Sequence, residues 1–442
     1  MIINTKCGAI EGIDSPFNPN VEIFRGIRYA KANRFSLPVL VDKWEGVYDA
    51  TNFKACCFQQ RAFEDESKNP SKKFYYNEFR KDDTFTYSED CLFLNIWREK
   101  NANNAPVLIY VHGGSFLGGC GNEKHFQGEK WCEKGVIVVT INYRLGPLGF
   151  LNVNEMQGNF ALHDIMAAIN WIEKNIKDYG GDCNNITLAG QSAGAIAVTT
   201  LLLSKKVNHK AILLSGGGVG HFMNPGKYSK AKVQKFWNKV VEKLNLNSLN
   251  EIYSVSVEKI FEAFKEVSKH HPIASFYSCS PYIDNYFLLD KGTKIFKNLK
   301  QVDTPCILSS TSEDIVPPIL FNMNKKWTRK FANSYRAYFS INLPGDNKGA
   351  FHSSDLWYFF GSLDKCWRPF TEDDYNLSNL MIDYYSNFVK SSNPNFEGHN
   401  IWLKQTKDMS KVMVFNKNPY FGKINKCKLY LSLFGLHGKG EN

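Results

Sequence analysis

Residues 186–198 read Ile-Thr-Leu-Ala-Gly-Gln-Ser-Ala-Gly-Ala-Ile-Ala-Val. The first four residues are apolar or β-branched, which is typical of a short buried strand, and the residues from Ala193 onward are small and compatible with a helix. Between them, Gly190 and Gly194 flank Ser192 in a G-x-S-x-G pattern. In a strand–turn–helix of this kind the serine hydroxyl is exposed at the apex, and side chains at the glycine positions would collide with neighbouring backbone. The alternative is an ordinary turn between strand and helix, in which the serine only caps the helix.

Strand patterns and helix patterns alternate along the chain on both sides of this turn. Near-continuous apolar runs over residues 106–111 and 136–141 are typical of strands that are buried on both faces in a parallel sheet. Residues 160–177 repeat apolar side chains at helical spacing, which predicts a helix that ends at Gly180 and Gly181. The alternation predicts an α/β fold, with a twisted, mostly parallel central sheet flanked by helices.

Other segments support coarser predictions. Further strands are expected at residues 9–13, 21–26, 90–97, 211–215, 304–310 and 335–339. Residues 60–85 are polar, charged and aromatic, and we interpret them as a surface loop. Residues 225–270 are rich in lysine and helical in pattern, and they are a candidate cap over one edge of the sheet. No repeat, linker or low-complexity segment divides the sequence, so we expect a single domain over residues 1–442.

Composition and charge limit the classes of partner. The net charge is +11, but the lysines are scattered without a run of five or six, which favours a solvated surface over a nucleic-acid partner. No apolar run approaches the roughly 18 residues that a membrane span requires. The eleven cysteines include no C-x-x-C pair, and no zinc-binding spacing or phosphate-binding loop occurs, so reduced thiols and no metal or cofactor are expected. Without a recognisable leader at the N-terminus, the prediction is a cytoplasmic protein.

A glycine-rich segment follows the expected strand at 106–111. It reads His-Gly-Gly-Ser over residues 112–115 and is similar to the HGGG-type loop that supplies backbone N–H donors to an oxyanion. The donors are predicted to be Gly114 and Ser115, with Ala193 after the nucleophile as the third. The alternative is a glycine-rich turn without a catalytic role.

A serine hydroxyl needs a base within hydrogen-bonding reach, usually a histidine held by a carboxylate. Glu313 and Asp314 follow the expected strand at 304–310, where the acid of this fold belongs. His352 follows the strand at 335–339, in the place of the base. His399 and His437 also come after the acid, but polar surroundings and a position near the C-terminus identify them as surface residues.

Several longer motifs then place the sequence in a family. They are Phe-Arg-Gly-Ile-Arg-Tyr-Ala at 24–30, Trp-Glu-Gly-Val-Tyr-Asp-Ala-Thr at 44–51, Ser-Glu-Asp-Cys-Leu-Phe-Leu-Asn at 88–95, Asn-Tyr-Arg-Leu-Gly-Pro-Leu-Gly-Phe at 142–150 and Gly-Gly-Asp-Cys-Asn-Asn-Ile-Thr at 180–187. With them the chain resembles the type-B carboxylesterase family of the α/β-hydrolase fold over nearly its whole length. Its Gly-Gln-Ser-Ala-Gly-Ala and Phe-His-Ser-Ser-Asp-Leu-Trp-Tyr segments look most like bacterial, para-nitrobenzyl-esterase-like members.

The resemblance implies hydrolysis of a small-molecule carboxylic ester through an acyl-enzyme, with Ser192, Asp314 and His352 as the triad. The family acid is usually a glutamate in an Asp-Glu-Gly motif, whereas the order here is Glu-Asp-Ile, so Glu313 remains an alternative acid. The resemblance also equates Cys57 and Cys91 with a disulfide of secreted relatives, and we expect these thiols to be reduced here.

Departures from the family pattern bear on the substrate. No counterpart of the choline-binding tryptophan occurs near Lys81, and Gln191 stands where cholinesterases have a glutamate, so a choline ester is not expected. The region after Gly220 is shorter than in typical members, which implies a reduced helical cap. The alternative to an esterase is a catalytically silent binding module of the same fold, although silent relatives usually lose the serine or the histidine. The sequence leaves the ester, its acyl-chain length and the oligomeric state open.

Overall fold

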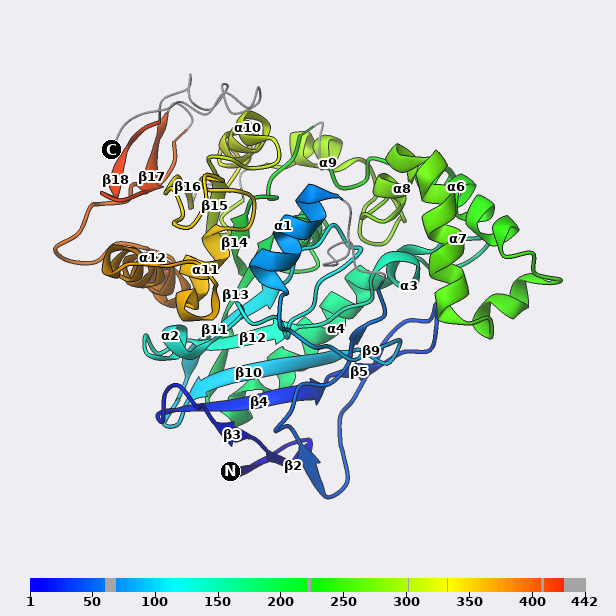
Figure 1. Cartoon of the computed structure of the whole chain (residues 1–442), viewed down its shortest axis with the longest axis horizontal. Coiled ribbons are helices and arrows are strands. Elements are labelled where there is room, and N and C mark those ends of the chain that lie inside the picture. The colour runs from blue at the N-terminus through cyan, green and yellow to red at the C-terminus, as the bar shows by residue number, and fades with distance from the viewer. Residues whose placement is uncertain (60–68, 221–223, 301, 332, 407–408, 425–442) are drawn as a thin grey trace.

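The computed structural model describes residues 1–59, 69–220, 224–300, 302–331, 333–406 and 409–424. A sheet of eleven strands occupies its centre, in the order β18-β17-β16-β15-β14-β13-β11-β12-β10-β4-β3 (Figure 1). The strands are β3 (Ile13–Asp14), β4 (Val21–Arg28), β10 (Phe93–Glu99), β11 (Ala105–Val111), β12 (Ile137–Ile141), β13 (Gly181–Gln191), β14 (Lys210–Leu214), β15 (Cys306–Thr311), β16 (Ser334–Phe339), β17 (Lys411–Phe415) and β18 (Tyr420–Lys423). Neighbouring strands are parallel from β12 to β17, and the outer pairs are antiparallel. The predicted α/β fold with a mostly parallel sheet is confirmed.

Smaller sheets and the helices surround this centre. The small sheets combine β1 (Ile2–Thr5), β2 (Gly8–Glu11) and β7 (Val47–Asp49), then β5 (Ala30–Lys31) and β6 (Val39–Leu40), and finally β8 (Cys56–Cys57) and β9 (Tyr87–Ser88). The helices are α1 (Pro70–Phe79), α2 (Glu129–Cys132), α3 (Gly146–Phe150), α4 (Phe160–Asn175), α5 (Ala193–Leu203), α6 (Lys230–Lys243), α7 (Val257–His270), α8 (Pro272–Ser278), α9 (Gly292–Asn298), α10 (Pro317–Trp327), α11 (Asp355–Phe360) and α12 (Glu372–Ser391). Short 3₁₀ turns cover Ile176–Tyr179, Leu249–Tyr253 and Leu363–Lys365.

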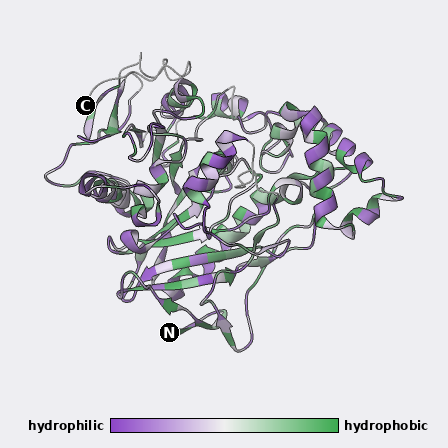
Figure 2. Cartoon of the chain, viewed as in Figure 1, coloured by the Kyte–Doolittle hydropathy of each residue, from purple (hydrophilic) through white to green (hydrophobic). Residues whose placement is uncertain are grey.

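Different helices cover the two faces of the sheet, because successive side chains of a strand point to opposite faces. On β11, Val107, Ile109 and Val111 share a hydrophobic cluster with residues of α4, α5 and α10. Leu108 and Tyr110 point the other way and pack with residues of α2, α11 and α12. Figure 2 shows hydrophobic residues along the central strands and a mixture of hydrophilic and hydrophobic residues on the outlying α6 and α7. The strands at 106–111 and 136–141 read as continuous apolar runs because both of their faces are covered.

The register of the parallel strands brings the turns of interest to one edge. Val111 of β11 pairs with Gly190 of β13. Gln191 pairs with Leu214 of β14, which in turn pairs with Ser309 of β15. Since the carboxyl ends of parallel strands lie at the same edge, the segments that follow these strands are neighbours.

The strand expected at 9–13 is divided at Gly12 between β2 and β3, which belong to different sheets, and the other predicted elements are found with shifted ends. The helix expected over 160–177 is α4, which continues into the 3₁₀ turn Ile176–Tyr179 and stops at Gly180, where φ is 80°. The strand expected at 186–189 is the last part of β13, which begins earlier, at Gly181. The lysine-rich segment forms α6 and α7, which lie with α8 at one side of the molecule, on the right in Figure 1.

One expectation was wrong. The part of residues 60–85 that the structure describes is not a loop throughout, because Pro70–Phe79 form helix α1. The Asn69 side chain caps this helix by accepting hydrogen bonds from the backbone N–H groups of its first turn, and a proline at the first helical position costs no hydrogen bond. The polar and aromatic sequence concealed the helix because its buried residues lie close to its end. Residues 60–68 fall outside the described part of the chain.

Candidate active site

Ser192 lies in the predicted turn between β13 and α5. Its backbone has φ 53° and ψ −121°, and its N–H donates to the Leu214 carbonyl at 2.9 Å. Glycines flank the turn for a steric reason. A Cβ on Gly190 would lie 2.5 Å from the Gly194 backbone carbon, and a Cβ on Gly194 would lie 2.0 Å from the Val111 carbonyl oxygen. Side chains at these positions would force the turn apart, so the G-x-S-x-G spacing follows from packing.

The structure brings His352 against Asp314. The imidazole Nδ1 lies 2.5 Å from Oδ1 of the carboxylate, whose side chain is fully buried. Oδ2 accepts from the Thr311 N–H at 3.2 Å, and Oδ1 also accepts from the Ile315 N–H at 2.9 Å. Burial opposes ionisation of Asp314, but the charge and hydrogen bond of His352, with bonds from Ser215 and Thr311, lower the pKa of the carboxyl below its usual range.

Glu313 points away from the imidazole and braces the loop that carries His352. Its carboxylate accepts from the Ala350 N–H at 3.0 Å and from the Ser312 hydroxyl. Its backbone N–H donates to the Ala350 carbonyl at 3.0 Å, which ties the two loops together. The side chains of the adjacent Glu313 and Asp314 thus point in different directions, and their carboxylates have different hydrogen-bond partners.

The glycine-rich loop after β11 is held in an unusual backbone conformation. Gly114 has φ 107° and Ser115 has φ 57°. The Gly114 carbonyl accepts from the N–H groups of Leu117 and Gly118, at 3.0 and 3.1 Å. A Cβ on Gly114 would lie 2.0 Å from the Gly118 carbonyl oxygen. Within the described chain, the N–H groups of Gly114, Ser115 and Ala193 donate to no other backbone group and remain available to a ligand.

His112 packs at the start of this loop. Its ring stacks on Tyr143 with centroids 4.4 Å apart, and its Nδ1 lies 2.8 Å from the Gly113 carbonyl. The Tyr143 hydroxyl donates to the His112 carbonyl at 2.7 Å. These contacts fix the direction in which the chain leaves β11.

A hollow of about 310 Å³ connects these groups. Its lining includes Ser192, His352, Gly114 and Ser115, and also His112, Gly113 and Gln191, which the sequence analysis named without a catalytic role. The residues that the sequence interpretation did not find are Ser71, Tyr75, Phe79, Arg80, Gly119, Glu123, His125, Phe126, Ile315, Ser353 and Leu356. The lining therefore combines aromatic side chains, such as Tyr75, Phe79 and Phe126, with polar and charged ones.

Helix α1 supplies two aromatic side chains of the lining, Tyr75 and Phe79. The Tyr75 hydroxyl donates to the His352 carbonyl at 3.2 Å, and Phe79 stacks on Trp357 with centroids 5.5 Å apart. The buried Glu78 carboxylate anchors the helix by accepting from Arg368 at 2.9 Å and from the Trp357 indole at 3.0 Å. The sequence held no local signal for this contact, because Glu78 and its partners are far apart along the chain.

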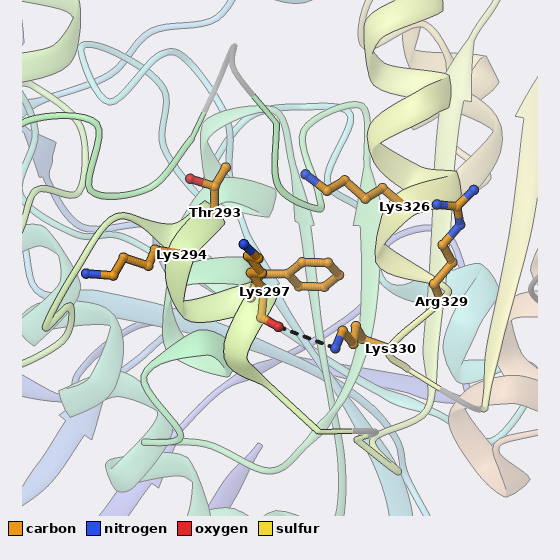
Figure 3. A pocket seen from close by; sticks show the side chains of 7 residues that line it. Thr293, Lys294, Lys297, Lys326, Arg329 and Lys330 are labelled. Atoms are coloured by element: carbon orange, nitrogen blue, oxygen red, sulfur yellow. Dashed lines mark hydrogen bonds between the residues drawn. The ribbon is translucent and has the colours of Figure 1, made fainter.

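A second hollow, of about 600 Å³, lies between α9 and α10 (Figure 3). It is lined by Thr293, Lys294, Phe296, Lys297, Lys326, Arg329 and Lys330. The Lys330 ammonium donates to the carbonyls of Lys297 and Leu299, at 3.5 and 2.7 Å. None of the lining residues is a histidine or a carboxylate, so this hollow lacks a base for serine chemistry.

Two wider searches cover only the residues that the structure describes. None of their helices is both long and apolar enough to cross a membrane. They also contain no cluster of three or more histidine, cysteine or acidic side chains suited to a metal ion.

The two cysteines equated with the family disulfide are neighbours. The Cys91 thiol is within hydrogen-bonding reach of Cys57, and that bond together with burial raises the pKa of Cys91. Cys57 Sγ also accepts from the Leu145 N–H at 3.1 Å. The prediction that both are reduced stays a prediction, because neighbouring thiols can be joined by oxidation.

Comparison with known proteins gives the family. The family model described as "Carboxylesterase family" matches residues 1–345 and 322–430. The chain belongs to the carboxylesterase family. As a member it is a carboxylic-ester hydrolase of the α/β-hydrolase fold, as the motifs at 24–30, 142–150 and 186–198 predicted.

Individual relatives agree with this membership. The carboxylesterase-family chain is 27% identical over 517 residues to the bile salt-activated lipase of Rattus norvegicus, covering 94% of this chain and 81% of that one. It is 27% identical over 489 residues to the para-nitrobenzyl esterase of Bacillus subtilis (strain 168), covering 94% of each. A solved structure of a PNB esterase superposes with a TM-score of 0.82 at 22% identity, covering 98% of this chain and 100% of that one, which shows a shared fold.

Proposed function

We propose that this carboxylesterase cleaves small-molecule carboxylic esters with Ser192 as nucleophile, His352 as general base and Asp314 as the acid. One observation carries the proposal: the 2.5 Å contact between His352 Nδ1 and Asp314 Oδ1, beside the hollow that Ser192 lines. An ionised Asp314 accepts the proton on Nδ1, so Nε2 keeps its lone pair and can take the serine proton. The lowered pKa of Asp314 keeps the carboxylate charged at neutral pH.

The reaction then follows from these positions. Ser192 Oγ attacks the ester carbonyl while its proton moves to His352 Nε2, and the imidazolium that forms lies against Asp314. The alcohol leaves with that proton, and water repeats the sequence on the acyl-enzyme. The developing oxyanion is expected to accept hydrogen bonds from the N–H groups of Gly114, Ser115 and Ala193. These groups have no backbone acceptor within the described chain.

The compartment and the domain organisation belong to the same proposal. A single domain over residues 1–442 is supported by one central sheet that takes strands from Ile13 to Lys423. A reducing cytoplasm is supported by an odd number of cysteines, eleven in all, without a regular spacing. No cofactor, metal or nucleic acid is required for the proposed reaction.

Turnover of simple esters tests the activity. The purified protein is expected to hydrolyse p-nitrophenyl acyl esters, and a series of acyl-chain lengths from acetate upward would show what the hollow accommodates. Ser192→Ala should keep the fold and lower kcat by about 10⁶. An intact wild-type protein that releases nitrophenol no faster than Ser192→Ala would favour the silent binding module instead.

A further inference from the structure

Gln191 is the last residue of β13, and its side chain reaches the general base. It is 2% exposed, so it belongs to the interior of the site. Its amide nitrogen lies 3.2 Å from His352 Nε2 and 2.8 Å from the Ser353 hydroxyl oxygen. On its other side, a Cβ on Gly113 would lie 2.5 Å from the amide oxygen, so the side chain fills the space between two loops of the site.

For the neutral ring the contact with His352 has one polarity. Asp314 accepts the proton on Nδ1, which leaves Nε2 of the neutral ring as an acceptor. The Gln191 group opposite Nε2 must therefore be the N–H of the amide. Ser353 Oγ accepts the second amide proton in this orientation. In the described chain the Ser192 hydroxyl makes no hydrogen bond to the ring, so this amide occupies the lone pair that later receives the serine proton.

We propose that Gln191 is a positioning residue that holds His352 as the neutral base and sets the lower pH limit of activity. This inference rests on the triad proposed above. An amide N–H can donate to the neutral ring but not to the imidazolium, whose two nitrogens are both donors. A hydrogen bond to the neutral form favours that form. When His352 takes up the serine proton, the Gln191 amide gives up Nε2 and keeps Ser353 as its partner.

A glutamate at this position would act in the opposite sense. Its carboxylate has no proton to donate to Nε2, and it attracts the imidazolium by charge. Gln191→Glu should therefore keep the base protonated, and the enzyme inactive, up to a higher pH.

Other charged and titratable groups also face His352. Asp314 follows β15, Asp355 begins α11, Tyr75 comes from α1, and Glu313 bonds the loop at Ala350. Asp355 and Asp314 act on the ring in wild type and variants alike. The effect of Gln191 is therefore measured as the difference in pH profile between wild type and variants, which all share these groups.

The experiment compares pH profiles of kcat/KM for p-nitrophenyl acetate in four proteins. Gln191→Glu is expected to move the half-plateau pH of the acid limb upward by about one unit, which is about a tenfold loss of rate on that limb. Gln191→Met has a similar length and no donor, and should move the limb in the same direction by less. Gln234→Glu is the matched control, since Gln234 lies on α6 and bonds the Asn154 carbonyl, and it should follow the wild type.

Two outcomes overturn the inference. If the folded Gln191→Glu and Gln191→Met proteins follow the wild-type profile to within about 0.2 pH unit, Gln191 does not influence the base. Near-ultraviolet circular dichroism establishes folding, and Gln191→Met decides the matter if the glutamate variant does not fold. Labelling of wild-type Ser192 by a fluorophosphonate separates the causes. If wild-type Ser192 is labelled and the pH profiles of the variants are unchanged, only the role of Gln191 is refuted. If wild-type Ser192 is not labelled, the proposed triad is refuted, and this inference with it.

Discussion

Asp314→Asn removes the charge beneath His352 with almost no change of shape. In the native site both carboxylate oxygens accept hydrogen bonds, Oδ1 from His352 and Ile315 and Oδ2 from Thr311. An asparagine has only one accepting oxygen. Its NH₂ group must face either the imidazole, which imposes the wrong tautomer, or the Thr311 N–H, which places donor against donor. Either arrangement weakens His352 as the general base, and the imidazolium formed during the reaction loses its counter-charge.

The expected loss is large. The equivalent change in a serine protease lowers kcat by about 10⁴, which corresponds to about 5.4 kcal/mol of activation free energy. Turnover is measured at pH 7–8 with saturating p-nitrophenyl butyrate, where the lowered pKa of Asp314 leaves the wild-type carboxylate fully ionised. Thermal unfolding establishes that the variant is folded at the assay temperature.

Glu313→Gln is the matched control, because it makes the same change one residue away. Glu313 accepts from Ala350 and Ser312 rather than from the imidazole, and a glutamine oxygen can still accept from the Ala350 N–H. Its kcat should fall by less than about tenfold. If Glu313→Gln lost more turnover than Asp314→Asn, the acid of the triad would be Glu313 and the geometry argued above would be wrong.

Three further predictions test other parts of the structure. Ser115→Pro deletes one proposed oxyanion donor and cannot keep the φ of 57° that Ser115 has, so it should cost at least about 3–4 kcal/mol of transition-state stabilisation, whereas Ser115→Gly should be mild; a folded proline variant with near-normal kcat would contradict this. If Cys57 and Cys91 are free thiols, a reductant should leave the melting temperature unchanged, and destabilisation of about 2–5 kcal/mol would identify a native disulfide. Burial and the nearby Asp314 raise the pKa of Asp355 from 3.8 to about 7. The fold favours the neutral form of the Asp355 carboxyl. The contribution of this preference to the free energy of unfolding is therefore complete below pH 3.8 and is lost as the pH rises through 7. Asp355→Asn should therefore gain up to about 4 kcal/mol of unfolding free energy relative to wild type between pH 4 and 8 in urea denaturation, and parallel pH curves would count against the shift.

The elements that local sequence determines were predicted with their approximate ends. Buried strands of the parallel sheet are continuous apolar runs, and the turn at Ser192 is fixed by glycines whose absent side chains make room for the backbone. Chain order also placed Glu313 and Asp314 just after β15 and His352 after β16, where the structure has them. In each case the physical cause lies within a few residues of the feature.

The remainder depends on contacts between distant segments. Helix α1 was missed because its buried carboxylate, Glu78, bonds to Arg368 and Trp357. Both partners are distant in the sequence, so the residues around Glu78 do not predict the contact. The choice between two adjacent carboxylates depends on side-chain direction, which spacing does not determine. Gln191 was noted only as a departure from the family pattern, since its partner His352 is 161 residues away.

The site of covalent labelling tests directly whether Ser192 is the nucleophile. The wild-type protein is incubated with a fluorophosphonate, and the modified peptide is located by mass spectrometry, with Ser192→Ala and Ser115→Gly treated in parallel. A single adduct on Ser192 is expected, with the same adduct in Ser115→Gly and none in Ser192→Ala. An adduct on another serine, or equal labelling of Ser192→Ala, would show that the nucleophile lies elsewhere.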